Sequence, residues 1–359
     1  MKKIVLTGGG TAGHVTPNIA LLPALQAAGY EIAYVGSYEG LGKKLIADFN
    51  IPYTGISTGK FRRYLDPKNF SDPFRVMKGF VEARNYLKNY QPDVVFSKGG
   101  FVSVPVVRAA ASLHIPCIIH ESDMTPGLAN KLCIPVAEKV CCNFPETMKN
   151  IPADKAVLTG SPIRAELAQG SRLAGLNMCG FTANKPVIMV IGGSLGAANV
   201  NKAVRDALPK LLEDFQVVHL CGKDKIDNLL LNTPGYKQFE YIKAELKDIF
   251  AMADVVISRA GANAICELLA LKKPNILIPL PAASSRGDQL LNAASFEAQG
   301  YSIVLNEDDI TTNLLVDKVH ELYFNRQNYV EAMSRSHQMD AINTIMLLIN
   351  EAANKSHTQ

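Results

Sequence analysis

The chain has 359 residues, of which 48% are hydrophobic and 19% are charged. This length exceeds what one hydrophobic core usually supports, so two domains of roughly 150–180 residues are expected. The formal net charge of +4 is too small to indicate nucleic-acid binding. No apolar stretch approaches about 18 residues, which excludes a transmembrane helix and leaves only peripheral membrane contact.

Short apolar segments alternate with segments of helical spacing through the first half of the chain. The first strand is expected at 2–7, where it ends in a glycine triplet, and helices are expected at 17–28 and 41–49. Further strands are expected at 31–36, 92–97, 116–121, 139–144 and 156–160. Apolar strands that alternate with helices predict a parallel sheet covered on both faces.

The same pattern restarts near residue 185. Its strands are expected at 185–193, 215–222, 239–242, 253–259, 274–281 and 301–305, with a helix at 198–213. The predicted fold class is therefore α/β, with two doubly wound Rossmann-like domains that face a cleft. The first domain is expected at 1–163 and the second at 164–339. A last helix at 340–356 is expected to pack back on the first domain.

A glycine-rich loop at 8–14 follows the first strand and opens a helix. Backbone N–H groups at such a turn can bind a diphosphate or another anion. Gly8, Gly10 and Gly13 also fit the GxGxxG pattern of dinucleotide-binding proteins. An NAD site needs an acidic residue at the end of the second strand, however, and Gly36 and Ser37 stand there. An NAD-dependent enzyme is one alternative at this point.

Two further loops follow strands in the same way, at 97–105 and 192–197. The loop at 192–197 fits the GxSxG pattern of a hydrolase nucleophile. A serine hydrolase also requires a histidine on a late loop, whereas His320, His337 and His357 lie in segments of helical pattern. Three glycine loops at the carboxyl ends of parallel strands predict a site for more than one phosphate group. For any single loop, tight helix–strand packing is the alternative.

Several side chains beside these loops are candidates for chemistry. His14 ends the first loop, where an imidazole can act as general base, and His120 ends a strand. Arg164, at the junction of the two halves, could bind phosphate. Glu267 starts a helix after a glycine turn and could hold ribose hydroxyls, or only complement the helix dipole. Gln289 could reach a sugar or cap its own helix.

The sequence contains no metal-binding pattern. Its seven cysteines are scattered, form no CxxC pair and indicate reduced thiols in a cytosolic protein. No DxD sequence or His/Cys cluster stands at the end of an expected strand. We therefore expect no tightly bound metal.

Residues 60–88 combine positive charge with aromatic side chains. They carry eight lysines and arginines against three acidic residues. Phe70, Phe74 and Met77, beside Arg75 and Lys78, are the expected membrane-contact residues, because an interfacial helix meets anionic lipid in this way. A core-facing helix with solvated lysines is the alternative.

Six motifs of the chain resemble, in order and spacing, those of the MurG family of GT-B glycosyltransferases. They are GGGTAGHVTP (8–17), SKGGFVSVP (97–105), HESDMTPGLANK (120–131), TGSPIR (159–164), GGSLGA (192–197) and SRAGANAICE (258–267). The resemblance spans nearly the whole chain. It implies an enzyme that transfers GlcNAc from UDP-GlcNAc, with inversion, to the C4 hydroxyl of MurNAc in lipid I. The product would be lipid II for peptidoglycan synthesis.

The resemblance also implies roles for individual residues. It makes His14 the catalytic base. It places the donor against Thr11, Ala12, Gly13, Arg164, Ser194, Ile242, Ala262, Asn263, Glu267 and Gln289. It places the acceptor or its diphosphate against Gly10, Gly99, Gly100 and Asp123. Many members have glycine where Ala12 stands and asparagine where Asp123 stands. In the family the asparagine would hold the donor sugar, so the aspartate at position 123 leaves that contact open.

The implied enzyme requires no cofactor, and UDP-GlcNAc is its donor substrate. Its expected partners are lipid I and an anionic membrane surface at the cytoplasmic face of the cell membrane, without nucleic acid. Other cell-wall synthesis and division proteins are candidate partners.

Two other functions stay open. One is a related UDP-sugar enzyme, such as a glycolipid glycosyltransferase or a UDP-GlcNAc 2-epimerase. The other is a membrane-docked scaffold without activity.

Overall fold

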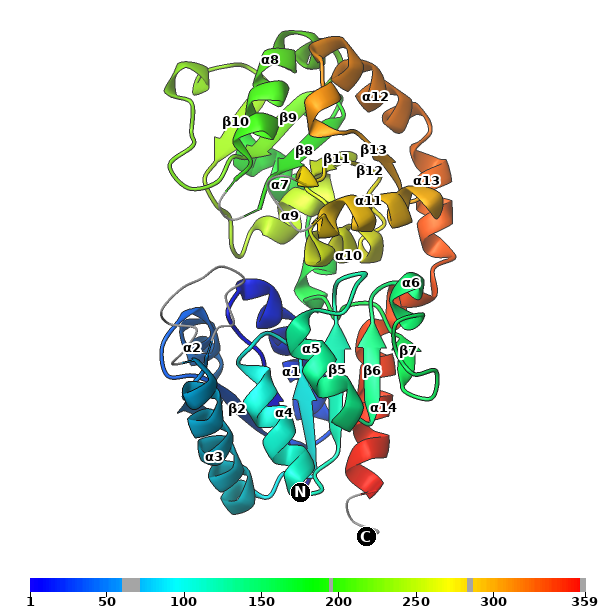
Figure 1. The fold of residues 1–359 in the computed structure, drawn as a ribbon. Coiled ribbons are helices and arrows are strands. Elements are labelled where there is room, and N and C mark those ends of the chain that lie inside the picture. The colour runs from blue at the N-terminus through cyan, green and yellow to red at the C-terminus, as the bar shows by residue number, and fades with distance from the viewer. Residues whose placement is uncertain (60–71, 194–195, 283–286, 356–359) are drawn as a thin grey trace. The chain divides into compact units, whose positions relative to one another are not determined.

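The computed structural model describes residues 1–59, 72–193, 196–282 and 287–355. The chain forms two compact units, which Figure 1 shows as ribbons. The first unit comprises Met1–Arg164 together with Asp340–Gln359, and the second comprises Ala165–Met339. The division falls one residue after the expected boundary, and the C-terminal segment belongs to the first unit.

The first unit is built on a parallel sheet with strand order β3-β2-β1-β4-β5-β6-β7. The chain proceeds from β1 toward one edge and then, from β4 on, toward the other edge. The carboxyl ends of β1 and β4 therefore flank the point where the winding reverses, which is where open α/β sheets bind ligands. The strands are β1 (Lys3–Thr7), β2 (Glu31–Ser37), β3 (Tyr53–Ile56), β4 (Val94–Ser97), β5 (Cys117–Glu121), β6 (Lys139–Cys142) and β7 (Ala156–Leu158).

Helices cover both faces of this sheet, because successive strand residues point to opposite faces and are apolar on each. Val5 packs in the core beneath α3, α4 and α5, whereas Ile4 and Leu6 pack beneath α1, α2 and α14. The last helix, α14 (Ala341–Lys355), contributes Ile345 and Ile349 to the second of these cores. The other helices are α1 (Thr16–Ala27), α2 (Leu41–Ile46), α3 (Asp72–Tyr90), α4 (Ser103–Ser112), α5 (Leu128–Cys133) and α6 (Pro145–Met148).

The second unit repeats the plan with strand order β10-β9-β8-β11-β12-β13. Its winding reverses between β8 and β11. The strands are β8 (Val187–Ile191), β9 (Gln216–Leu220), β10 (Tyr236–Phe239), β11 (Val255–Ser258), β12 (Asn275–Leu277) and β13 (Ser302–Val304). The helices are α7 (Arg172–Cys179), α8 (Ala198–Asp214), α9 (Leu246–Met252), α10 (Ala262–Ala270), α11 (Asp288–Ala298), α12 (Thr312–Phe324) and α13 (Arg326–Ser334). These two sheets confirm the predicted α/β class.

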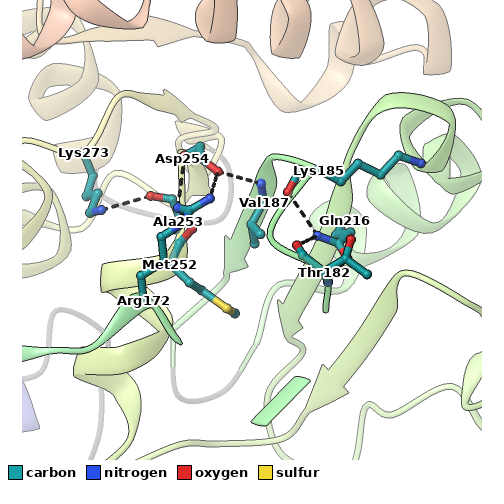
Figure 2. Close-up of polar contacts among 9 residues, drawn as sticks. All are labelled: Arg172, Thr182, Lys185, Val187, Gln216, Met252, Ala253, Asp254 and Lys273. Atoms are coloured by element: carbon teal, nitrogen blue, oxygen red, sulfur yellow. Dashed lines mark hydrogen bonds and ion pairs between the residues drawn. The ribbon is translucent and has the colours of Figure 1, made fainter. Parts of the chain in front are cut away.

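Polar contacts fasten the amino ends of the strands in the second unit (Figure 2). The Asp254 carboxylate accepts hydrogen bonds from the Val187 backbone N–H at 2.8 Å and from two Arg172 nitrogens at 3.2 and 3.1 Å. The Gln216 side chain accepts from the Thr182 N–H at 2.7 Å and donates to the Thr182 carbonyl at 2.9 Å. The contacts at the amino ends of these strands therefore stabilise the fold. The glycine loops follow the opposite, carboxyl ends of the strands.

Two details differ from expectation. The strand expected at 239–242 was wrong, because β10 spans Tyr236–Phe239. It begins after Gly235, whose φ of 77° turns the chain, and it alternates buried and exposed residues. Strand β3 was not expected because it is short and contains Gly55. None of the helices in the described ranges combines the length and the hydrophobicity of a membrane span.

Candidate functional site

Two glycine loops of the first unit approach each other where its winding reverses. Gly100, with φ of 82°, lies so close to the loop after β1 that a Cβ atom on it would meet the Gly9 carbonyl oxygen at 2.2 Å. A Cβ atom on Gly8 would lie 2.3 Å from the His14 carbonyl oxygen. Gly10 also has a positive φ, of 96°. Glycine is therefore required here for close backbone contact, and backbone N–H groups of loops of this kind can bind an anionic ligand.

His14 stands at the end of the first loop, in a single helical turn formed by Ala12–His14. Its Nδ1 lies 3.0 Å from the Thr11 hydroxyl oxygen. The pKa of His14 is lowered to about 4, first by burial and then by the positive charge of Lys98. The imidazole is therefore uncharged at neutral pH and has a lone pair with which to accept a proton.

Which ring nitrogen can act as base follows from the Thr11 contact. If Nδ1 carries the proton and donates it to the Thr11 oxygen, Nε2 carries the lone pair. If the hydroxyl donates instead, the proton sits on Nε2 and that atom cannot accept another. A base at Nε2 thus requires Thr11 to accept the hydrogen bond from His14.

Lys98 lies in the second of these loops, and its importance was not foreseen from the sequence. Its side chain is only 1% exposed, and its Nζ lies 2.9 Å from His120 Nδ1 and against the Ser122 hydroxyl. His120 is fully buried, with Nε2 2.9 Å from the Gly160 carbonyl oxygen. Burial lowers the pKa of His120 well below its usual value. The sequence feature that could have indicated Lys98 is its position directly between a buried strand and two glycines.

Glu121 organises the loop that follows β5. Its carboxylate accepts hydrogen bonds from the Asp123 and Gly127 backbone N–H groups at 2.9 and 3.0 Å and from Asn130 Nδ2 at 2.8 Å. Burial raises the pKa of Glu121 above its usual value. Asn130 also lies close to Gly99, whose φ is 91° and on which a Cβ atom would lie 3.2 Å from the Asn130 side-chain oxygen. The structure thus positions Asp123 through its backbone.

The second unit presents its own loops where its winding reverses. Gly196 has φ of 68°, and a Cβ atom on it would meet the Cys221 carbonyl oxygen at 2.0 Å. Arg259 lies directly after β11, is buried, and forms an ion pair with Glu307. It also donates to the Ile278 carbonyl at 3.0 Å, beyond the end of β12. Arg259 therefore ties together the ends of two neighbouring strands.

The predicted donor residues are distributed over both units. Thr11, Ala12, Gly13 and Arg164 belong to the first unit, and the others belong to the second. Ala262 and Asn263 begin α10, and Glu267 lies on its second turn. The Gln289 side chain accepts a hydrogen bond from the Leu280 N–H at 3.1 Å, so it joins α11 to the segment after β12. Ser194 lies outside the described residues.

Ile242 follows β10 and is buried. Its neighbour Tyr241 is exposed. Any contact between a ligand and Ile242 would therefore use its backbone.

No group of three or more His, Cys, Asp or Glu side chains in the described ranges could hold a metal ion.

An apolar surface with flanking cations lies at the start of α3. Phe74, Met77 and Val81 are 78%, 63% and 53% exposed. Arg75 and Lys78 are exposed beside them, and Lys78 lies 3.6 Å from Glu82. The opposite side of α3 supplies Ala83 and Leu87 to the core. Phe70, the remaining predicted membrane-contact residue, lies outside the described residues.

Comparison with known proteins identifies the family. Residues 4–142 match the glycosyltransferase family 28 N-terminal domain, and residues 187–346 match its C-terminal domain. A relative from Lachnospira eligens is 64% identical over 98% of this chain and 99% of its own length. It is named UDP-N-acetylglucosamine--N-acetylmuramyl-(pentapeptide) pyrophosphoryl-undecaprenol N-acetylglucosamine transferase. The chain belongs to the MurG family. The expected family resemblance is thereby confirmed.

Structural comparison agrees with membership of the MurG family. The crystal structure of MurG from Acinetobacter baumannii is 28% identical, with a TM-score of 0.77, and the match covers 98% of this chain and 100% of that one. A putative UDP-N-acetylglucosamine 2-epimerase from Listeria monocytogenes has a TM-score of 0.69 at 14% identity, over 100% of this chain and 97% of its own. That second likeness shows a shared fold alone.

Proposed function

We propose that this chain transfers GlcNAc from UDP-GlcNAc to the C4 hydroxyl of MurNAc in undecaprenyl-diphospho-MurNAc-pentapeptide (lipid I), forming lipid II. The names of full-length relatives support the overall reaction. The geometric observation that carries the proposal is the contact between the two glycine loops of the first unit, with His14 at the end of one of them. Such an arrangement offers a proton acceptor next to backbone suited to a diphosphate, and lipid I carries both a hydroxyl and a diphosphate.

The proposed reaction is a single displacement with inversion. His14 Nε2 removes the proton of the C4 hydroxyl as its oxygen attacks C1 of GlcNAc. The bond between C1 and the diphosphate oxygen breaks, and UDP leaves with that electron pair. The glycine loop that precedes α8, together with Arg164, is proposed to stabilise the departing charge, because fixed dipoles and guanidinium groups favour a developing anion.

The remaining donor contacts are proposed on the basis of family membership. Glu267 is assigned to the ribose hydroxyls and the Ile242 backbone to the uracil. Gln289 is assigned to the sugar. Asp123 and the loops with Gly10, Gly99 and Gly100 are assigned to the acceptor. No cofactor is required in this proposal, because a hydroxyl nucleophile, a base and a diphosphate leaving group account for every bond that changes.

We further propose that the enzyme docks on the cytoplasmic face of the cell membrane through α3. The exposed Phe74 and Met77 beside Arg75 and Lys78 support this, since apolar side chains flanked by cations bind anionic lipid. Docking would also bring the enzyme close to other cell-wall synthesis and division proteins, which are candidate partners.

Sedimentation with phosphatidylglycerol vesicles tests the docking proposal. The double variant Phe74→Ser, Met77→Ser should lose vesicle binding, whereas Leu347→Ser should keep it. Leu347 is a suitable control because it is also 63% exposed, on α14 of the same unit. Equal binding by both variants would contradict docking through α3. Equal binding of the wild-type protein to phosphatidylcholine vesicles would contradict the role of the cations.

The reaction itself is tested with purified protein and radiolabelled UDP-GlcNAc, with and without a short-chain lipid I analogue. Transfer of label to the analogue, with release of UDP, is the expected result. Conversion of UDP-GlcNAc without acceptor would indicate epimerisation instead. Binding of UDP-GlcNAc with neither reaction would reject lipid I as the acceptor.

A further inference from the structure

Tyr34 is a buried tyrosine in the middle of β2, the strand next to β1 in the sheet of the first unit. Its side chain is fully buried in the core that Ile4 and Leu6 also line. Its ring stacks on the ring of Tyr53, with centroids 5.7 Å apart and planes inclined by 8°. A phenylalanine could bury a ring of the same shape, whereas a buried tyrosine hydroxyl needs a polar partner. The partner of the hydroxyl therefore decides what Tyr34 does beyond packing.

The Tyr34 hydroxyl contacts the glycine loop that follows β1. It donates a hydrogen bond to the Gly8 carbonyl at 2.8 Å and accepts one from Asn18 Nδ2 at 3.3 Å. The same Asn18 nitrogen donates to the Thr7 carbonyl at 3.0 Å. Asn18 lies on α1 and is fully buried as well. Two consecutive backbone carbonyls are thus held by buried side chains.

The next carbonyl of the loop also faces the protein. A Cβ atom on Gly100 would meet the Gly9 carbonyl oxygen at 2.2 Å, so this oxygen packs against the second glycine loop. In a trans peptide the C=O and the N–H point in opposite directions. The N–H groups of Gly9 and Gly10, which share peptide groups with the Gly8 and Gly9 carbonyls, therefore point away from these contacts. Neither N–H donates to any residue that the structure describes. An anion at this loop would meet N–H groups rather than carbonyl oxygens.

We propose that Tyr34 and Asn18 are positioning residues that hold these carbonyls toward the core and thereby turn the N–H groups of the loop toward the diphosphate of the acceptor. The inference rests on the proposed function for the identity of that ligand. Within the described part of the chain, the Tyr34 hydroxyl is the only donor to the Gly8 carbonyl. Without it the peptide can rotate, and its oxygen would then repel a phosphate group that the N–H now attracts.

Tyr53 provides a matched control for Tyr34. It lies on the neighbouring strand β3, and its hydroxyl donates to the Ser37 carbonyl at 2.6 Å. Tyr53→Phe therefore removes a hydrogen bond of the same kind, from a ring stacked on the first, but at the end of β2 instead of at the glycine loop. The two variants differ in which backbone carbonyl loses its donor.

The test compares Tyr34→Phe with Tyr53→Phe in steady-state transfer to a short-chain lipid I analogue. Tyr34→Phe should raise the KM for the analogue by roughly 2- to 13-fold, the factor that corresponds to one hydrogen bond, and leave the KM for UDP-GlcNAc near the wild-type value. Tyr53→Phe should change neither KM. A tyrosine that only packs the core would lower the active fraction and the apparent kcat with both KM values unmoved. That result, or an equal effect of the two variants on the KM for the analogue, would overturn the proposal.

A second variant and a second measurement keep the outcomes distinct. If Tyr34→Phe does not fold, Asn18→Ala removes the donor to the Thr7 carbonyl instead, and an unchanged KM for the analogue would then overturn the proposal. Amide hydrogen exchange of residues 8–14 needs no activity and should be faster in Tyr34→Phe but not in Tyr53→Phe, because a loop that loses a hydrogen bond opens more often. Unchanged exchange in Tyr34→Phe would refute the positioning role. Absence of transfer by the wild-type protein would reject the proposed function and leave the exchange result standing.

Discussion

The contact between Thr11 and His14 makes a sharp test of the proposed base. Thr11→Val keeps the shape of the side chain and removes the oxygen that lies 3.0 Å from His14 Nδ1. The ring then loses the partner that holds the proton on Nδ1. A hydrogen bond of this kind contributes about 0.5–1.5 kcal/mol. At about 1.36 kcal/mol per factor of ten in rate, kcat should fall by roughly 2- to 13-fold.

Steady-state transfer to a lipid I analogue measures the effect, with kcat and the KM for UDP-GlcNAc determined separately. If Thr11 orients His14, kcat falls and KM stays near the wild-type value. Thr11→Ser retains the hydroxyl and should retain most of the rate. An unchanged kcat in Thr11→Val would refute the reasoning. A rise in KM alone would instead assign Thr11 to the donor, the role that family resemblance implies.

The remaining predictions concern the base, a buried ion pair and acid stability. His14→Ala should lower kcat by roughly 10²–10⁴-fold in the transfer assay, with an unchanged circular dichroism spectrum, and near-normal turnover would exclude His14 as the base. Glu307→Ala leaves the charge of the buried Arg259 without its ion-pair partner and should lower the free energy of unfolding in urea by about 3–5 kcal/mol. Lys202→Ala removes one member of an exposed ion pair and should lower the same free energy by about 0.5 kcal/mol or less. Burial and the charge of Arg205 lower the pKa of His219 to about 3 in the folded protein. As the pH falls below about 6.5, His219 is therefore protonated in the unfolded chain while it stays uncharged in the folded protein. Acidification from pH 7 to pH 5 should therefore cost about 2 kcal/mol through this residue, and His219→Gln should reduce the slope of stability against pH.

The sequence was most informative about β1, β4, β8 and β11 and the loops that follow them. Each of these strands is a short apolar run with a glycine within three residues of its end. Both the presence of the strands and their parallel pairing could therefore be predicted. β10 was misplaced because its polar residues hide the alternation of an edge strand, and β3 was missed because it is short. Strand type is thus predictable where burial on both faces dominates the composition.

The side-chain contacts of the site were less predictable than its loops. His14 could be selected because it directly follows a glycine loop. The partnership of Lys98 with His120 could not be predicted, because it depends on β4 lying beside β5 in the sheet. The burial of Ile242 and the bond from the Leu280 N–H to Gln289 likewise arise from how distant segments pack. Local pattern indicates where a ligand can bind, whereas packing decides the protonation and orientation of each group.

The return of α14 to the first unit affects how the protein can fold during synthesis. Ile345 and Ile349 complete the core over Ile4 and Leu6, yet the ribosome must first make the whole of Ala165–Met339. At about 5–20 residues per second, that interval lasts roughly 10–35 s. Throughout it, one face of the nascent first sheet lacks part of its cover. The second unit is complete in sequence before the first, so we expect it to finish folding first, and the nascent amino-terminal sheet to be the part that a chaperone protects.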